Sequence, residues 1–173
     1  MTMQLIQHQE LGSAQSSITF SSIPQTYTDL VLVICARADG SGYADPVSDT
    51  TFFFNTSSAN FSYRTLFGNG SSVTTNTTAH NFTTGSNSTA NTFGNMQLYI
   101  PNYTSSNNKS FSVDSTTENN GSLARQYMAA GLWSQTAAIT EIKVAPTINI
   151  WVQYTSATLY GILKGSDGIT TVS

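Results

Sequence analysis

The chain has 173 residues, of which only 9% are Asp, Glu, Lys or Arg, and its formal net charge is -3 at pH 7. Soluble domains usually carry about 25% charged residues, so hydroxyl and amide groups from 24 serines, 26 threonines and 14 asparagines must keep this surface wet. The six basic residues form no stripe that could neutralise phosphates, which argues against nucleic acid as a partner. No apolar run approaches the ~20 residues of a membrane helix.

The length and the apolar content are those of one folded domain over residues 1–173. An apolar fraction of 39% supplies a core, and a chain of this size buries roughly 70% of its unfolded surface. The first ten residues lack the basic and apolar regions of a signal peptide, so we expect synthesis in the cytoplasm.

In the first third of the chain, apolar residues recur at every second position, which predicts β-strands. We expect strands at residues 3–11, 18–23 and 30–36. The third is apolar without interruption, which is typical of a strand covered on both faces. We therefore expect the lone Cys35 to be buried there as a small apolar group.

Three acidic residues, Asp39, Asp45 and Asp49, lie in and beside the glycine-containing loop that follows. Flexible oxygen ligands suit calcium, but the spacing is not that of an EF-hand, and Asp-Gly and Asp-Pro are ordinary turn pairs. We expect a structural turn, with no metal ion and no cofactor.

Phe52, Phe53 and Phe54 place aromatic rings on both faces of the next strand. If one face packs inward, the other needs cover from a second layer or another chain. The strand expected at residues 148–152, which contains Trp151, is apolar on both faces too. Symmetric oligomers supply such cover by mating identical surfaces, so these four aromatic residues are the predicted oligomer or partner interface.

After a strand at residues 61–65, residues 68–95 are nearly all Gly, Ser, Thr and Asn. Such a segment has too little apolar surface to be core. We therefore expect a long exposed excursion or a poorly ordered loop, and long loops on rigid scaffolds often carry binding.

Alternation returns in the second half, with strands expected around residues 96–100, 111–113, 127–133, 142–144 and 159–163. No helical period is sustained, and no repeat of roughly 20 to 50 residues is present. About eight to ten strands with long, uneven connections predict an all-β fold, an antiparallel β-sandwich of jelly-roll-like type.

The sequence contains no recognisable set of catalytic residues. Neither His8 nor His80 accompanies a Gly-x-Ser-x-Gly elbow, which a serine hydrolase of that type needs. A glycosidase needs two facing carboxylates, whereas the acidic residues fall mostly in predicted turns, where Asp caps backbone groups; a facing pair stays open but is not favoured. We expect a protein that is not an enzyme, and a polysaccharide-degrading enzyme is the least favoured class.

Sugar binding is the main alternative to the predicted oligomer or partner interface. Exposed aromatic rings offer flat apolar faces to sugars, while hydroxyl and amide groups offer hydrogen bonds. Tyr103, Tyr127 and Trp133 are the candidate glycan platform, although large aromatic residues are more often buried.

Several segments resemble small virion structural proteins of tailed bacteriophages, and they occur in the expected order along both halves of the chain. These are SITFSSIPQTYTDL at 17–30 with the strand that ends at Arg37, LYIPNY at 98–103 with Lys109 behind it, GLW at 131–133 followed by AITEI at 138–142, and LYGI at 159–162. Related segments occur both as small free-standing proteins and as domains of tail-fibre proteins.

The resemblance implies a β-sandwich that assembles on the virion, as a homotrimer. A short free-standing chain favours a capsid decoration (cement) protein that binds the major capsid protein and stabilises the shell. In this role residues 1–11 would act as a strand or arm that adds to a neighbour's sheet. The alternative is a tail-associated module that binds a receptor or glycan. The family carries no motif-defined catalytic residues.

Overall fold

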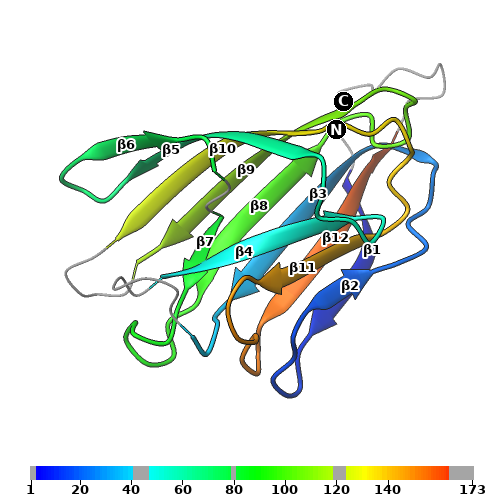
Figure 1. The fold of residues 1–173 in the computed structure, drawn as a ribbon. Helices are drawn as coiled ribbons and strands as arrows, with labels where there is room; N and C mark the ends of the chain where they lie inside the picture. The colour runs from blue at the N-terminus through cyan, green and yellow to red at the C-terminus, as the bar shows by residue number, and fades with distance from the viewer. Residues whose placement is uncertain (1–2, 41–46, 79–80, 119–123, 164–173) are drawn as a thin grey trace.

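A computed structural model of the chain describes residues 3–40, 47–78, 81–118 and 124–163. These residues contain twelve β-strands and no helix. The strands form two antiparallel sheets, and the small sheet lies in front of the large one in Figure 1. The predicted antiparallel β-sandwich is therefore confirmed.

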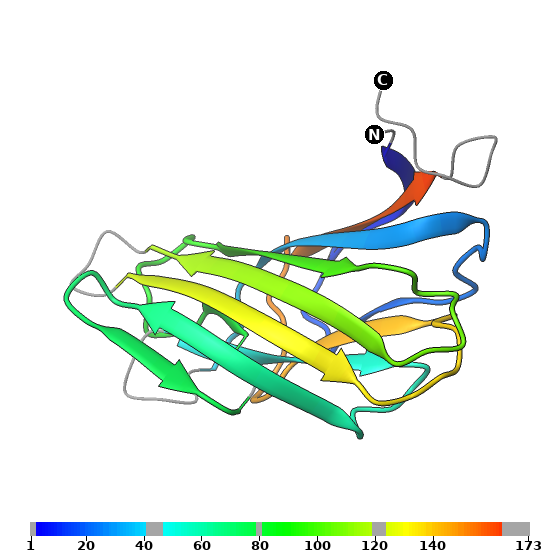
Figure 2. The same cartoon turned by 90° about the horizontal axis from the view of Figure 1, so that it is seen from above.

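The large sheet has eight strands, in the spatial order β1 (Met3–Glu10), β12 (Ser156–Leu163), β3 (Tyr27–Ala36), β8 (Gly94–Ile100), β9 (Lys109–Thr117), β10 (Arg125–Trp133), β5 (Phe61–Gly68) and β6 (Val73–Asn76). The small sheet has four, in the order β2 (Ile18–Phe20), β11 (Ile142–Pro146), β4 (Val47–Phe54) and β7 (Phe82–Thr84). The large sheet twists along its width, with β1 at one extreme and β6 at the other (Figure 2).

Most neighbouring strands are distant in sequence, as the long connections of a jelly-roll-like sandwich require. β1 pairs with β12, and β3 lies between β12 and β8. The strand expected at residues 148–152 does not form, because Trp151 makes only isolated bridges, to Gln15 and Ala38. Two short strands that were not expected from the sequence, β6 and β7, raise the number of strands.

Alternation along the strands decides which side chains form the core. On β8, Met96, Leu98 and Ile100 are buried between the sheets, whereas Asn95 and Gln97 are exposed on the other face. The same period of two runs through β9 and β10. β8, β9 and β10 therefore each have an inner face toward the small sheet and an outer face toward solvent.

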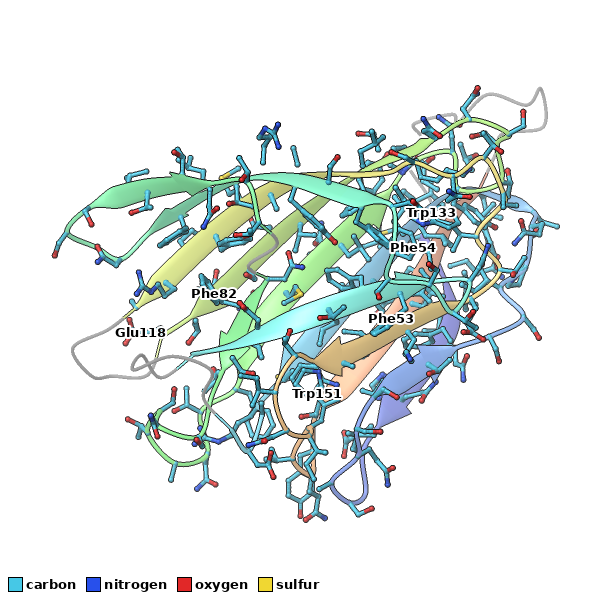
Figure 3. The ribbon with its side chains drawn as sticks, viewed as in Figure 1. Phe53, Phe54, Phe82, Glu118, Trp133 and Trp151 are labelled. Atoms are coloured by element: carbon cyan, nitrogen blue, oxygen red, sulfur yellow. The ribbon has the colours of Figure 1, made fainter. Side chains whose placement is uncertain are left out.

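Phe54 on β4 connects the two layers. Its ring centroid lies 5.1 Å from that of Phe61, and 5.6 Å from both Phe111 and Trp133. These three partners come from β5, β9 and β10 of the large sheet. Figure 3 shows Phe54 and Trp133 close together between the sheets. Edge-to-face contacts of this kind stabilise the core beyond the burial of their area.

The expectation of an exposed excursion at residues 68–95 is wrong for residues 81–85, which are buried. Asn81, Phe82, Thr83 and Thr84 are buried, and the last three form β7. Thr83 Oγ1 donates to the carbonyl of Ala36 at 2.7 Å, and Asn81 Nδ2 donates to that of Thr50 at 3.2 Å. Polar side chains can enter the core here because they hydrogen-bond backbone carbonyls there.

A single cation orders the loop that follows β7. The guanidinium of Arg37 donates to four backbone carbonyls at 2.9 to 3.2 Å, those of Ser86, Ser88, Thr89 and Thr92. Desolvation lowers the pKa of Arg37 below its ordinary value. Five donors in a rigid fork can satisfy several carbonyls at once, so the loop has a defined shape despite its composition.

Cys35 lies on the outer face of β3 and is exposed, so the prediction of a buried thiol is wrong. Residues on both faces of β3 are apolar, but among the described residues none forms a third layer over the outer face. Val31 is buried beside its register neighbours Tyr99 and Tyr160, whereas Val33 is 40% exposed. Neighbouring side chains on the same face can therefore cover part of an apolar strand without another layer.

A glycine at a crowded contact gives the first prediction. A Cβ added to Gly131 would lie 2.2 Å from the ring of Phe111, whereas one added to the exposed Gly12 meets nothing within 4 Å. Gly131→Ala should lower the free energy of unfolding by about 1–3 kcal/mol through overpacking, and Gly12→Ala should change it by less than about 0.5 kcal/mol. Urea denaturation measures both, and equal stability of the two variants would contradict this packing.

Candidate functional site

The predicted interface residues lie mainly inside the sandwich. Phe52, Phe54 and Trp151 are at most 1% exposed, so the prediction that they form a surface contact is wrong. The second layer that they need is the chain's own, because β4 belongs to the small sheet and Trp151 packs at its end (Figure 3). Phe53 points outward and is half-buried, with the Lys143 ammonium 3.8 Å from its ring centroid.

The predicted glycan platform is also internal. Tyr103 and Tyr127 are fully buried and Trp133 is 3% exposed, so no sugar can reach their rings. Strand alternation turns Tyr127 and Trp133 toward the small sheet, and Tyr127 packs edge-on against Phe82 with centroids 5.3 Å apart. This prediction is wrong because the rings fill the core.

Chemical groups that could hold a metal ion are dispersed in the described part of the chain. There, no three or more His, Cys, Asp or Glu side chains gather closely enough for a metal. Asp39 caps a backbone group, accepting from the amide of Ile150 at 3.0 Å, while Asp45 and His80 lie outside the described residues. His8 hydrogen-bonds Thr158 at 2.8 Å.

The segments that resemble phage proteins meet at one corner of the sandwich. The hydroxyl of Tyr103 donates to the carbonyl of Pro24, and the carbonyl of Tyr103 accepts from the amide of Ile139 at 3.0 Å. The amide of Ile23 donates to Thr140 at 3.0 Å. We call this unit the Tyr103 corner; it joins residues 23–30, 98–103 and 138–142.

Asp29 strengthens the same corner from its outer side. Its carboxylate accepts the Tyr99 hydroxyl and the amide of Asn102, both at 2.9 Å. Across the sheet, a Cβ on Gly161 would lie 2.3 Å from the ring of Tyr27. The fourth phage-like segment, 159–162, therefore packs against the first.

Lys109 is a buried cation next to the Tyr103 corner. It is 1% exposed, and its ammonium donates to the carbonyls of Ser105 at 2.7 Å and Asn107 at 2.5 Å. Longer bonds reach Gln135 and Thr136. Desolvation lowers the pKa of Lys109 below its ordinary value. The ammonium holds two loops together, which is a structural role.

The outer face of the large sheet is the least covered apolar surface that the structure describes. Six of the nine large hydrophobic residues that are exposed lie on it by register; they are Met3, Leu5, Val33, Leu66, Val73 and Met128. They fall into two groups. Met3, Leu5 and Val33, on β1 and β3, form what we call the β1 patch.

Leu66 and Met128 of the second group line a depression of 930 Å³, which we call the outer trough. Its floor is low because Ala130 and Ser112 are register neighbours on β10 and β9. On the same row of side chains, Arg64 of β5 flanks Ala130 and Tyr99 of β8 flanks Ser112. Sequence alternation alone predicts that Ala130 faces outward, but only strand pairing brings these four residues side by side.

Comparisons with known proteins do not assign this chain to a family: no family model, no curated protein and no solved structure matches it. The described residues contain no helix long and apolar enough to span a membrane. The two surface features, the β1 patch and the outer trough, are therefore the candidate functional sites.

The second prediction compares two lysines, one buried in the protein and one nearer its surface. Lys109→Met leaves the carbonyls of Ser105 and Asn107 without their donor in a buried place, so the free energy of unfolding should fall by about 2 kcal/mol. Lys143→Met removes only a half-buried contact with the Phe53 ring, worth about 0.5–1 kcal/mol. Urea denaturation of both variants tests this, and a larger loss for Lys143→Met would contradict the buried role of Lys109.

The exposed thiol gives the third prediction. Cys35 should react with iodoacetamide in the folded protein, as mass spectrometry of the native chain will show. Burial of part of the side chain raises the pKa of Cys35, so less thiolate forms at neutral pH and the reaction should speed up at higher pH than in the unfolded chain. A thiol that reacts only in denaturant would contradict its place on the outer face.

Proposed function

We propose that this chain is a non-enzymatic structural protein of a tailed-bacteriophage virion, a capsid decoration protein that binds the major capsid protein and stabilises the shell. The observation that carries the proposal is the Tyr103 corner. Segments that resemble phage virion proteins are scattered over the sequence, yet hydrogen bonds join parts of three of them, 23–30, 98–103 and 138–142, into one structural unit. This is expected if the resemblance reflects a shared fold and not a chance likeness of short peptides.

The β1 patch is the contact surface that we propose for the neighbouring protein. β1 is eight residues long, contains no Lys, Arg or Pro, and pairs only with β12 among the described strands. Edge strands of soluble proteins are usually protected by charge, proline or shortness. An open edge beside exposed Met3 and Leu5 suits pairing with a strand of another chain.

The expected N-terminal arm takes a different form in this proposal. Met3–Glu10 already pairs within its own chain along β12. It therefore offers its free edge to a neighbour without leaving the sheet. As a homotrimer the protein would present three such edges, so that weak contacts are multiplied by avidity.

A tail-associated module that binds a receptor or glycan is the second candidate. The aromatic residues first chosen for it are buried, but the outer trough offers another binding surface. The location on the virion separates the two candidates.

The fourth prediction concerns the particle. Virions that lack this protein should release DNA at a lower temperature than virions that carry it, as a DNA-binding dye will report during heating. Equal heat resistance would contradict the cement role. Light scattering of the purified protein should give three times the mass of one chain, and a monomer would contradict the trimer.

A matched pair of variants tests the contact surface. Val33→Lys places a charge on the β3 side of the β1 patch without disturbing the core, so occupancy on the particle should fall about tenfold or more, because burying an unpaired ammonium is costly. Ala14→Lys adds the same charge at an exposed loop position and should bind as the wild type does. Full occupancy by Val33→Lys would show that the contact lies elsewhere.

A further inference from the structure

The outer trough has the size of a site for a small or linear ligand. Its volume of 930 Å³ falls within the range of about 300–1,000 Å³ that such sites usually have. Arg64 and Tyr99 border it three strand spacings apart, which is about 14 Å at the usual separation of strands. A flat protein surface would span this hollow without filling it, whereas a narrow chain can enter it.

One wall of the trough is an aromatic ring with a fixed position. Tyr99 is half-buried on the outer face, and its hydroxyl donates to Asp29 Oδ2 at 2.9 Å. Desolvation, together with the bond to Asp29, raises the pKa of Tyr99, so the ring stays a neutral phenol. A tethered aromatic ring of this kind is a suitable apolar contact for the C–H face of a sugar.

The other walls are rich in hydroxyl groups. Ser110 and Ser112 on β9 and Thr75 of β6 all line the trough with exposed side chains. Leu66 and Met128 add apolar contacts on the next row. Such a lining suits ligands whose ring faces need apolar contact and whose edges need hydrogen bonds.

The two charges in the trough are of opposite sign. Arg64 makes one hydrogen bond, from Nη1 to the carbonyl of Tyr63 at 2.7 Å, and Asp114 Oδ1 accepts one from Gln126 at 2.9 Å. Remaining guanidinium donors and carboxylate lone pairs can bind ligand hydroxyls. Because the two charges cancel, the trough favours a neutral ligand over an anionic one.

We propose that the outer trough binds a neutral oligosaccharide, laid across β9 and β10 with one sugar ring against Tyr99 and the hydroxyls of further sugar units on Arg64 and Asp114. This site does not depend on where the protein lies in a virion, and it lies apart from the β1 patch. It would give the protein a second kind of contact, with a hydroxyl-rich polymer.

The fifth prediction tests this site by isothermal titration calorimetry with neutral glucan, galactan and mannan oligomers, and with polygalacturonate as the acidic comparison. The wild type should bind at least one neutral oligomer. Ala130→Trp fills the floor of the trough at an exposed position and should weaken binding by about tenfold or more. Asp114→Asn keeps the side-chain size and should weaken binding by a smaller factor.

Asn95→Trp is the matched control, because Asn95 is exposed on the same face but outside the trough. It should bind as the wild type does, and so should Val33→Lys, which separates this site from the proposed particle contact. The proposal is overturned if no neutral oligomer binds at millimolar concentration, if only polygalacturonate binds, or if Ala130→Trp binds as well as Asn95→Trp.

Discussion

The contact between Phe54 and the large sheet is the interaction on which the rest of the structure depends. Phe54 is fully buried and meets aromatic rings from three neighbouring strands. The space for this cluster comes from Gly131, whose missing side chain lets the ring of Phe111 lie against β10. This packing sets the distance between the sheets. The outer face of β9 and β10 follows from the same register, because residues that alternate with the buried ones must face outward.

As a result, the two faces of the large sheet carry side chains of different size. The inner face carries large aromatic and aliphatic side chains, whereas the outer face above the same strands carries Ala130 and Ser112. Small outward side chains on two paired strands leave a hollow, which larger residues on β5 and β8 border. The trough therefore results from strand register and not from a loop, and it lies over the strands that carry Phe111 and Trp133 of the aromatic cluster.

Much of the fold could be predicted from alternation, since a period of two identifies strands wherever one face is buried. Alternation does not tell which face is inner, so it predicts a surface position for Phe52 and Trp151, whereas both lie inside the sandwich. Composition misled in the segment at 81–84, where Asn81 and Thr83 are buried because they bind backbone carbonyls. The trough could not be predicted, because it needs Arg64, Ala130, Ser112 and Tyr99 from four strands in one register.

Arg37 and Lys109 hold their loops through main-chain carbonyls. A carbonyl oxygen takes up no proton as the pH falls, and acid keeps both cations charged. Loops that are tied by carboxylates lose their partners when these groups are protonated. The contacts by which Arg37 and Lys109 hold their loops are therefore insensitive to acid, unlike contacts made by carboxylates.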